Sequence, residues 1–342
     1  MQIQENISLR PYHTFGIDVT ARYFASFRSI ADLQEILKAG LTTEMKLPKI
    51  ILGGGSNVLF TKDFDGLVLK NEIVGIEKTK EDDDHVYLRV GAGENWHHFV
   101  MYCVQNGYGG VENLSLIPGC VGASPMQNIG AYGVELREVF HGLTAFHLQE
   151  QNNYTFRLSD CEFGYRDSVF KKKYKDQFVI SYVSFRLNKK HVLNTSYGAI
   201  EQELQNMGVT EPDIRSVSQA VINIRTSKLP DPAVTGNAGS FFKNPSVSEA
   251  SYQKLKNDFP EMPGYPNEDG TIKLAAGFLI EQCGWKGYRK GDAGVHPKQA
   301  LVLVNYGNST GEEIFNLSDQ IAASVLENFG VVLEREVNVV AG

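Results

Sequence analysis

The sequence predicts a protein of two or three domains, with strands dominating the first part and helices the last. Three observations support this prediction. The 342 residues exceed what a single average core needs. Short apolar runs separated by glycine-rich turns fill the chain up to about residue 208. Apolar residues at helical spacing follow residue 213, so we expect a domain boundary at 208–213.

The composition is that of an ordinary globular protein, at 42% apolar and 21% charged residues. A formal net charge of -7 argues against a general nucleic-acid binder, which needs a basic face. No stretch approaches the ~20 continuous apolar residues of a membrane helix, and the first residues do not resemble a secretory signal. The four cysteines lie far apart without a C-x-x-C pair, so we expect neither a metal site nor a disulfide framework. This cysteine usage predicts a reducing compartment.

The first part is expected to contain two helices among several strands. Ser29 and Asp32 have capping-box spacing before an apolar face, and Gly40 would end that helix. A second helix is expected from Trp96 to Val104, before Gly107. Strands are predicted at 50–52, 58–60, 66–69, 86–90, 143–148 and 178–187. The acidic run 81–84 is interpreted as a hairpin tip, and the lysines at 171–173 and 175 as a solvated turn.

In the last part, apolar residues share one helical face in three segments, 217–224, 252–259 and 314–325. Gly330 would stop the third helix, and a final strand is expected from Val331 to Val340.

The stretch KIILGGGSNVLF, from Lys49 to Phe60, is a strand that runs into glycines. A dinucleotide-binding Rossmann turn would need a third glycine where Val58 stands, and a helix after it. A P-loop would need Gly-Lys-Ser/Thr, which is missing. Taken alone, the stretch can equally be a glycine-rich strand turn.

A second glycine-rich stretch runs from Leu116 to Gly133 and carries very little charge. We expect a long loop whose small residues let the backbone approach a ligand closely. Successive backbone N–H groups in such turns bind anions without lysine. Two such loops in one strand-rich part suggest an elongated ligand with a pyrophosphate, for which flavin adenine dinucleotide (FAD) is suitable.

Eight motifs in order along the chain carry a resemblance to a known family: PYHTFGI, GGGSNVLF, GAGENWHHFV, IPGCVGASPMQNIGAYGVE, FGYRDS, RTSKLPDP, GNAGSFFKNP and LEREV. The chain closely resembles the UDP-N-acetylenolpyruvoylglucosamine reductases, the MurB-type flavoenzymes of peptidoglycan synthesis. The resemblance implies an α+β fold, with a two-part flavin-binding domain of the p-cresol methylhydroxylase type and a separate α+β substrate-binding domain. The implied domains are 1–73 and 74–213 for FAD, 214–330 for substrate, and 331–342 as a strand returning to the flavin part.

The resemblance further implies non-covalent FAD, with NADPH as co-substrate, and no metal. Reduced flavin would deliver hydride to the enolpyruvyl CH₂ of UDP-N-acetylglucosamine enolpyruvate, giving UDP-N-acetylmuramate. The implied flavin contacts are Gly53, Gly54, Gly55, Ser56, Asn57, Val58, Pro118, Gly119, Ser124, Gln127, Asn128, Gly130 and Arg225. A cytoplasmic monomer without nucleic-acid or membrane partners is expected.

Ser240, in NAGSFFKNP, matches the family's proton donor. A very weak acid is suited to protonating a strongly basic carbanion. A hydrolase nucleophile would need G-x-S-x-G, which this segment lacks. A capping or turn serine is the structural alternative.

Two charged residues complete the implied catalytic set. Arg166, in FGYRDS, would steady the substrate carboxylate by bidentate bonding; a surface ion pair, for example with Asp167, is the alternative. Alternation along a strand places Glu334 and Glu336 on one face, roughly 7 Å apart. Each could raise the pKa of the other, so a protonated Glu336 could donate to the enolate; an exposed polar face is the alternative. Arg335 replaces the usual proline of the family, and its side chain should point to the opposite face.

The implied substrate contacts are less sharply defined. Lys228 and Asn244 match positions that hold the uridine diphosphate. Tyr197, in LNTSYGAI, matches a tyrosine on a loop that closes over the substrate in one subtype of the family. Further candidates are Tyr132, Tyr165, Tyr265 and Gln299.

Two other functional classes stay open from the residues alone. A flavin-dependent oxidase of the same fold would often tether its cofactor, and His97 and Cys120 lie near the relevant loops. A non-catalytic nucleotide-binding protein would not need Ser240, Arg166 and Glu336 together in their family contexts.

Overall fold

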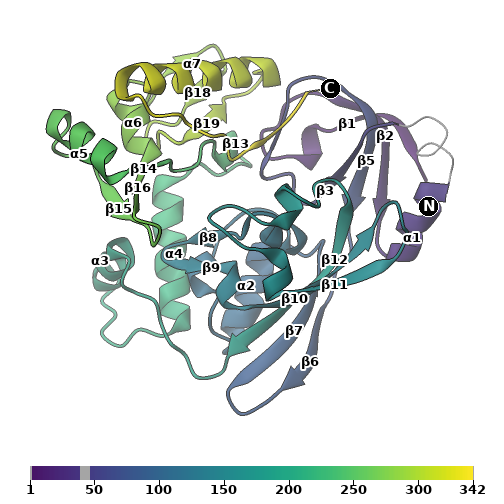
Figure 1. The fold of residues 1–342 in the computed structure, drawn as a ribbon. Coiled ribbons are helices and arrows are strands. Elements are labelled where there is room, and N and C mark those ends of the chain that lie inside the picture. The colour runs from purple at the N-terminus through teal and green to yellow at the C-terminus, as the bar shows by residue number, and fades with distance from the viewer. Residues whose placement is uncertain (1, 39–46, 342) are drawn as a thin grey trace. The chain divides into compact units, whose positions relative to one another are not determined.

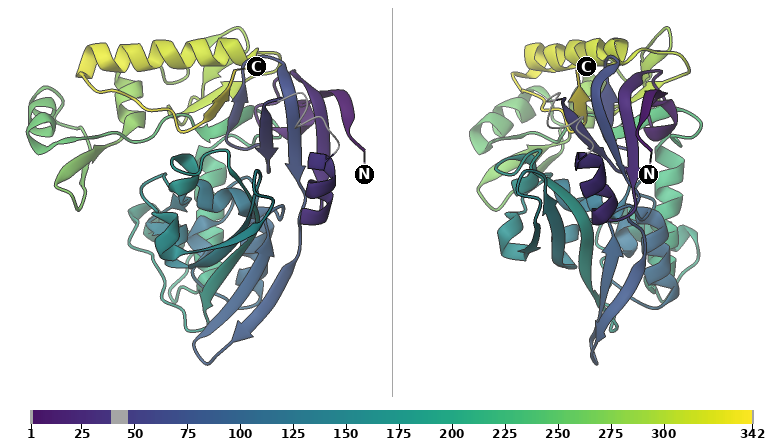
Figure 2. Two further views of the ribbon diagram at one scale, coloured as in Figure 1. Left: turned by 45° about the vertical axis from the view of Figure 1, so that its right-hand side comes forward. Right: turned by 90° about the vertical axis from the view of Figure 1, so that its right-hand side faces the viewer.

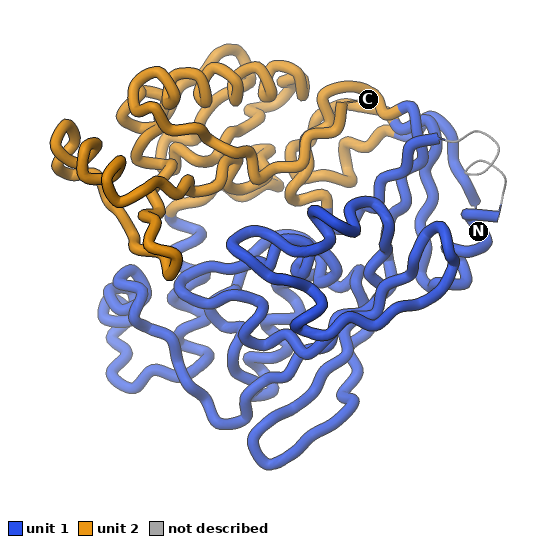
Figure 3. The backbone as a smooth tube through the Cα atoms, in the orientation of Figure 1, with its two compact units in different colours: residues 1–7, 21–54, 65–227 blue, residues 8–20, 55–64, 228–342 orange. Residues whose placement is uncertain are grey.

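The computed structural model describes residues 2–38 and 47–341, so the predicted helix stop at Gly40 lies outside the described residues. The chain forms two compact units, each built from three segments (Figure 3). Unit 1 comprises residues 1–7, 21–54 and 65–227, and unit 2 comprises 8–20, 55–64 and 228–342. The finer domain limits at 73, 213 and 330 stay predictions.

The first sheet of unit 1 has the order β1-β2-β5-β3 (Figure 1). Its strands are β1 (Gln4–Ser8), β2 (Thr20–Phe27), β3 (Lys49–Leu52) and β5 (Phe64–Asn71). Helix α1 (Ile30–Lys38) begins at Ser29, whose hydroxyl accepts the Asp32 N–H at 3.1 Å. Its apolar face packs with Leu67 and Leu69 of β5 in one core. The predicted start of this helix and the predicted strands at 50–52 and 66–69 are confirmed.

The second sheet of unit 1 is antiparallel, with the order β11-β10-β12-β7-β6. Its blue β6–β7 hairpin lies at the lower end of both views in Figure 2. Its strands are β6 (Ile76–Glu81), β7 (His85–Gly91), β10 (Phe140–His147), β11 (Asn153–Arg157) and β12 (Phe178–Asn188). Helix α2 (Trp96–Gln105) buries all its predicted apolar residues against this sheet, with Phe99 and Phe185 ring centroids 4.5 Å apart. The acidic run forms the β6–β7 hairpin tip, as predicted.

The segment from Leu116 to Gly133 is more regular than the expected loop. It contains a 3₁₀ helix, Val121–Gln127, which Asn128 ends in a left-handed conformation. The short strands β8 (Gly130–Ala131) and β9 (Val134–Glu135) follow. Unit 1 also contains the 3₁₀ helix η2 (Glu112–Leu114), α3 (Gly198–Asn206) and most of α4 (Ile214–Lys228).

Unit 2 contains a sheet of order β13-β19-β18-β17 and the long helix α7 (Gly311–Phe329). The strands are β13 (Gly236–Ser240), β17 (Arg289–Lys290), β18 (Ala293–Val295) and β19 (Val302–Asn305). Thr310 and Glu313 form a capping box, and Gly330, at φ +67°, ends α7 as predicted. Within the described part of the chain, no helix combines the length and apolarity needed to cross a membrane.

A smaller sheet of unit 2, ordered β14-β16-β15, carries α5 (Glu249–Asp258). Its strands are β14 (Ser246–Ser248), β15 (Gly264–Pro266) and β16 (Thr271–Leu274); α6 (Ala276–Gln282) follows.

The predicted last strand is too long. Only β20 (Asn338–Val340) forms a ladder, parallel to β4 (Val58–Phe60). Before it, Arg335 makes a single bridge with Phe242, because the chain there changes partner from the residues after β13 to β4.

Candidate active site

The two glycine-rich stretches meet within unit 1. A Cβ atom on Gly54 would lie 2.7 Å from the Gly119 Cα, so any larger residue would force the two loops apart. Gly53 lies against Cys120, and the Gly119 carbonyl accepts the Trp96 N–H at 3.0 Å. The backbones of the two segments thus form one continuous surface.

The first stretch continues into unit 2. Gly55 has φ +61°, and a Cβ there would lie 2.1 Å from the Tyr12 carbonyl oxygen. Strand β4 follows instead of a helix, in agreement with the failed Rossmann match. Asn57 Nδ2 donates to the Glu336 carbonyl at 3.2 Å, which connects the glycine stretch to the terminal segment.

Four non-glycine residues of unit 1 adopt left-handed backbone conformations around the second stretch. They are Leu116, Asn128, Tyr132 and Arg166, with φ of 58°, 42°, 51° and 52°. Such conformations cost energy and cluster at functional sites. The Asn128 side-chain amide forms hydrogen bonds within the protein, to Glu135, Gly164 and Arg137. Ser124 likewise donates to the Val121 carbonyl. Pro118 is exposed, while Gln127 and Gly130 are partly buried.

Arg166 is held against the second glycine stretch. Its guanidinium donates to the Gly130 carbonyl at 2.7 Å and lies 5.5 Å from the ring centroid of Tyr165, an exposed side chain. The neighbouring Asp167 carboxylate pairs with Lys172. The cation is therefore oriented by a backbone carbonyl of the loop implicated in flavin binding.

The segments that carry Ser240 and Glu336 pair within unit 2. Gly239 has φ +70°, and the β13–β19 register is irregular between Asn237 and Ser240, which leaves the Ser240 residue exposed. The next residue, Phe241, accepts the Glu336 N–H at 2.8 Å. Residues almost one hundred positions apart are thus neighbours through one backbone hydrogen bond.

The side chains around Glu336 alternate as predicted. Arg335 points to α7, where its Nε donates to the Ser318 hydroxyl at 2.9 Å and its guanidinium pairs with Asp319. Glu334 is exposed and forms an ion pair with Lys243. Because Lys243 neutralises Glu334, the expected carboxylate–carboxylate interaction with Glu336 is weakened.

Three of the implied ligand contacts of unit 1 form one cluster. The Tyr132 and Tyr197 rings meet edge to face, with centroids 5.4 Å apart. Arg225 Nε donates to the Leu116 carbonyl at 3.2 Å, and its guanidinium interacts with the Tyr132 hydroxyl. Burial lowers the pKa of Arg225 and raises that of Tyr132.

The implied substrate contacts of unit 2 are more dispersed. Lys228 is exposed at the end of α4, and Tyr265 is exposed on β15. Asn244 Oδ1 accepts the Ala276 N–H at 3.0 Å and so caps α6, which leaves the amide nitrogen as its ligand-binding group. The Gln299 side chain lies beside Gly277 at the same helix start.

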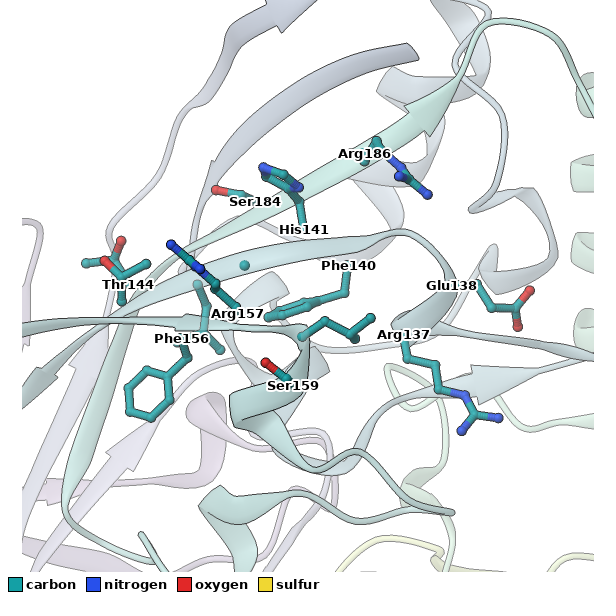
Figure 4. Close-up of a pocket in the computed structure, with 14 residues that line it drawn as sticks. Arg137, Glu138, Phe140, His141, Thr144, Phe156, Arg157, Ser159, Ser184 and Arg186 are labelled. Atoms are coloured by element: carbon teal, nitrogen blue, oxygen red, sulfur yellow. The ribbon is translucent and has the colours of Figure 1, made fainter. Parts of the chain in front are cut away.

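A separate groove of about 670 Å³ lies on the exposed face of β10, β11 and β12 in unit 1. It is lined by Arg137, His141, Arg157 and Arg186, among others, and by none of the predicted site residues. The arginines are spread along the groove and do not converge on one point (Figure 4). We therefore do not assign the chemistry to it.

The residues of unit 1 are suited to the pyrophosphate of FAD. The Gly54–Gly119 contact surface presents backbone without side chains, as anion-binding turns do. Two cations flank it, since Lys70 Nζ donates to the Gly53 carbonyl and Arg225 bonds the Leu116 carbonyl. Lys70 was missed from the sequence because nothing in a strand pattern indicates that its side chain reaches the glycines.

Comparisons with known proteins match both parts of the chain. A family model described as FAD binding domain matches residues 21–148, and one described as UDP-N-acetylenolpyruvoylglucosamine reductase, C-terminal domain, matches 231–340. A reductase of that name from Flavobacterium johnsoniae is 50% identical over 99% of this chain and 100% of its own. Another, from Amoebophilus asiaticus, is 51% identical over 99% and 100%.

The solved structure of the reductase from Thermus caldophilus covers 99% of both chains at 21% identity, with a TM-score of 0.69, and shows the same fold. The predicted fold, a flavin-binding part joined to a separate α+β domain, is confirmed. Since identity near 50% extends over almost the whole of both sequences, the chain belongs to the UDP-N-acetylenolpyruvoylglucosamine reductase family.

Proposed function

We infer that the chain reduces UDP-N-acetylglucosamine enolpyruvate to UDP-N-acetylmuramate with NADPH, as an FAD-containing oxidoreductase. The observation that carries this inference is 50% identity to a named reductase over 99% of the chain. FAD held by the residues assigned below would supply hydride transfer from NADPH to the enolpyruvyl group.

The chain's own residues are assigned the remaining tasks. Hydride addition at the CH₂ carbon leaves negative charge at the carbon that bears the carboxylate. Arg166 stabilises that charge through its permanent cation, oriented by the Gly130 carbonyl. Ser240 donates the proton, and its exposed position at the β13 bulge leaves its hydroxyl accessible to a ligand. Glu336, held by Phe241 and Asn57 through its backbone, supports the enolate as a hydrogen-bond donor when protonated.

The ligand contacts are assigned in the same way. FAD is held by Gly53, Gly54, Gly55, Ser56, Asn57, Val58, Pro118, Gly119, Ser124, Gln127, Asn128, Gly130 and Arg225. Tyr132, Tyr165, Tyr197, Lys228, Asn244, Tyr265 and Gln299 hold the sugar nucleotide. We further propose that the protein is cytoplasmic, because UDP-sugars and NADPH occur in that compartment. We also propose that it is a monomer, which size-exclusion chromatography with light scattering can test.

The decisive experiment follows NADPH absorbance with purified holoenzyme, with and without the enolpyruvyl sugar nucleotide. Oxidation that depends on this substrate, with one UDP-N-acetylmuramate formed per NADPH, supports the proposed function. NADPH-independent oxygen consumption with an alcohol or amine would instead assign the chain to the oxidase class.

A further inference from the structure

A single buried side chain joins the segment that carries Tyr197 to the second glycine stretch. This tyrosine segment, residues 189–197, connects β12 to α3 in unit 1. Asn113, in η2 and only 1% exposed, donates from Nδ2 to the Tyr132 carbonyl at 3.0 Å and to the Asn194 carbonyl at 2.8 Å. One side-chain amide therefore bonds both the tyrosine segment and the second glycine stretch, at what we call the junction.

Other contacts depend on the same junction. Asn194 Nδ2 donates back to the Gly133 carbonyl at 2.9 Å. The Tyr132 and Tyr197 rings meet nearby, with centroids 5.4 Å apart. Tyr132 and Gly133 both have left-handed backbones, at φ 51° and 81°, which need support from surrounding structure. The position of Tyr197 is thus coupled to a strained turn through Asn113 and Asn194.

The Asn113 side chain stabilises the fold through its amide N–H groups and not through its oxygen. Its Oδ1 atom is buried and, within residues 2–38 and 47–341, has no hydrogen-bond partner. Burying an unsatisfied amide oxygen is unfavourable, and leucine of similar size would avoid it. Only a donor, however, can bond two carbonyls at once. No recognisable motif marks this role in the sequence, where Asn113 stands between Glu112 and Leu114.

We propose that Asn113 is a positioning residue that latches the tyrosine segment, and so places Tyr197 for binding of the sugar nucleotide. The second half of this statement rests on the proposed function. The latch itself is a property of unit 1 and can be tested without substrate.

The first test is limited proteolysis of the holoenzyme, because trypsin can cleave after Lys189 and Lys190 at the start of the segment. Asn113→Ala removes both donors and should accelerate this cleavage about 10-fold or more through local opening. Asn194→Ala removes the side-chain bonds to the Gly133 carbonyl and from the Ser196 hydroxyl but keeps the bond from Asn113 to the residue 194 carbonyl, so it should cause a smaller acceleration. If Asn113→Ala does not fold, hydrogen exchange in wild-type residues 189–197 as fast as in an unstructured peptide would overturn the latch.

Asn71→Ala is the matched control, because Asn71 is also a buried asparagine of unit 1 and donates to the Ile180 carbonyl at 2.9 Å. It should lower global stability without accelerating cleavage at Lys189 and Lys190. Equal acceleration in Asn71→Ala and Asn113→Ala would show general loosening and overturn the latch. Unchanged cleavage in a folded Asn113→Ala variant would overturn it as well.

The second test concerns ligand binding. Asn113→Ala should raise KM for the enolpyruvyl sugar nucleotide about 10-fold or more, while rapid-mixing absorbance shows an unchanged rate of flavin reduction by NADPH. An unchanged KM in a variant whose tyrosine segment has opened would overturn the role of Asn113 in placing Tyr197. A wild-type enzyme that does not turn over this substrate would refute the proposed function and leave the proteolysis result standing.

Discussion

At the scale of single residues, the local backbone at Ser240 explains how a serine in a strand can serve chemistry. Gly239 supplies a positive φ that serine or alanine would adopt only with strain, and the register irregularity redirects the next side chain. Ser240 is exposed although Phe241 and Phe242 beside it are buried. The buried phenylalanines anchor the segment, so the hydroxyl is presented from a rigid support.

We expect Ser240→Ala to leave flavin reduction by NADPH nearly intact and to slow substrate reduction about 10³–10⁴-fold, because only the second half-reaction needs the proton. Stopped-flow absorbance of the flavin separates the two half-reactions. Ser248→Ala, at the exposed cap of α5, is a control that should change neither. Equal losses in both half-reactions of Ser240→Ala would rule out the proton-donor assignment.

His13 gives unit 2 a pH-dependent stability. Burial lowers the pKa of His13, although its Nε2 lies 3.1 Å from the Ile17 carbonyl. The unfolded chain therefore binds the proton more readily than the folded chain, so stability falls as the pH drops through about 6.5 toward the folded pKa. Urea unfolding at pH 7.5 and 5.5 should show a smaller pH effect in His13→Asn than in the wild type. Identical pH effects would contradict this role for His13.

At the scale of elements, the backbone bonding of the segment before β20 is compatible with proline at position 335. Arg335 and Phe242 form a β-bridge through the hydrogen bonds of their neighbours. The Glu336 N–H donates to the Phe241 carbonyl, and the Lys243 N–H donates to the Glu334 carbonyl. Among the described residues, no backbone bond uses the Arg335 N–H. Proline lacks that donor and so loses no sheet bond here.

We therefore expect Arg335→Pro to keep kcat within about threefold of the wild type and to lower the free energy of unfolding by about 1 kcal/mol, through the lost contacts with Ser318 and Asp319. Urea titration and steady-state kinetics provide the two measurements. Asn338→Pro is the contrasting variant, because it removes the bond from the Asn338 N–H to the Asn57 carbonyl. A loss of activity in Arg335→Pro as large as in Ser240→Ala would mean that the backbone bonding of this segment has been misassigned.

At the scale of the whole molecule, the assigned residues are divided over the two units, with Arg166 and Arg225 in unit 1 and Ser240 and Glu336 in unit 2. The glycine stretch 53–58 itself passes from one unit to the other. A ligand bound only by the folded chain stabilises it by mass action, by about 2.7 kcal/mol at a free concentration of 100 Kd.

Removing the flavin should therefore lower the Tm, and adding FAD should restore it in a concentration-dependent manner. Acid precipitation should release all the yellow colour, because the assigned contacts are non-covalent; riboflavin serves as a control ligand without the pyrophosphate and should stabilise less. Colour that stays with the precipitate would indicate a covalent tether, for which Cys120 and His97 would be the first residues to examine by mass spectrometry.

The sequence alone determined the periodic elements, the family motifs and the residues assigned to chemistry, because helical spacing and side-chain type are local properties. It predicted α1, α2 and α7 closely, and it correctly placed β4 after the first glycine stretch. Tertiary structure decided which distant backbones meet. The Gly54–Gly119 contact, the Phe241–Glu336 bond and the short ladder of β20 depend on pairing between remote segments. The bonds of Asn113 do too, since an amide's partners are set by the packing around it and by no pattern in its neighbours.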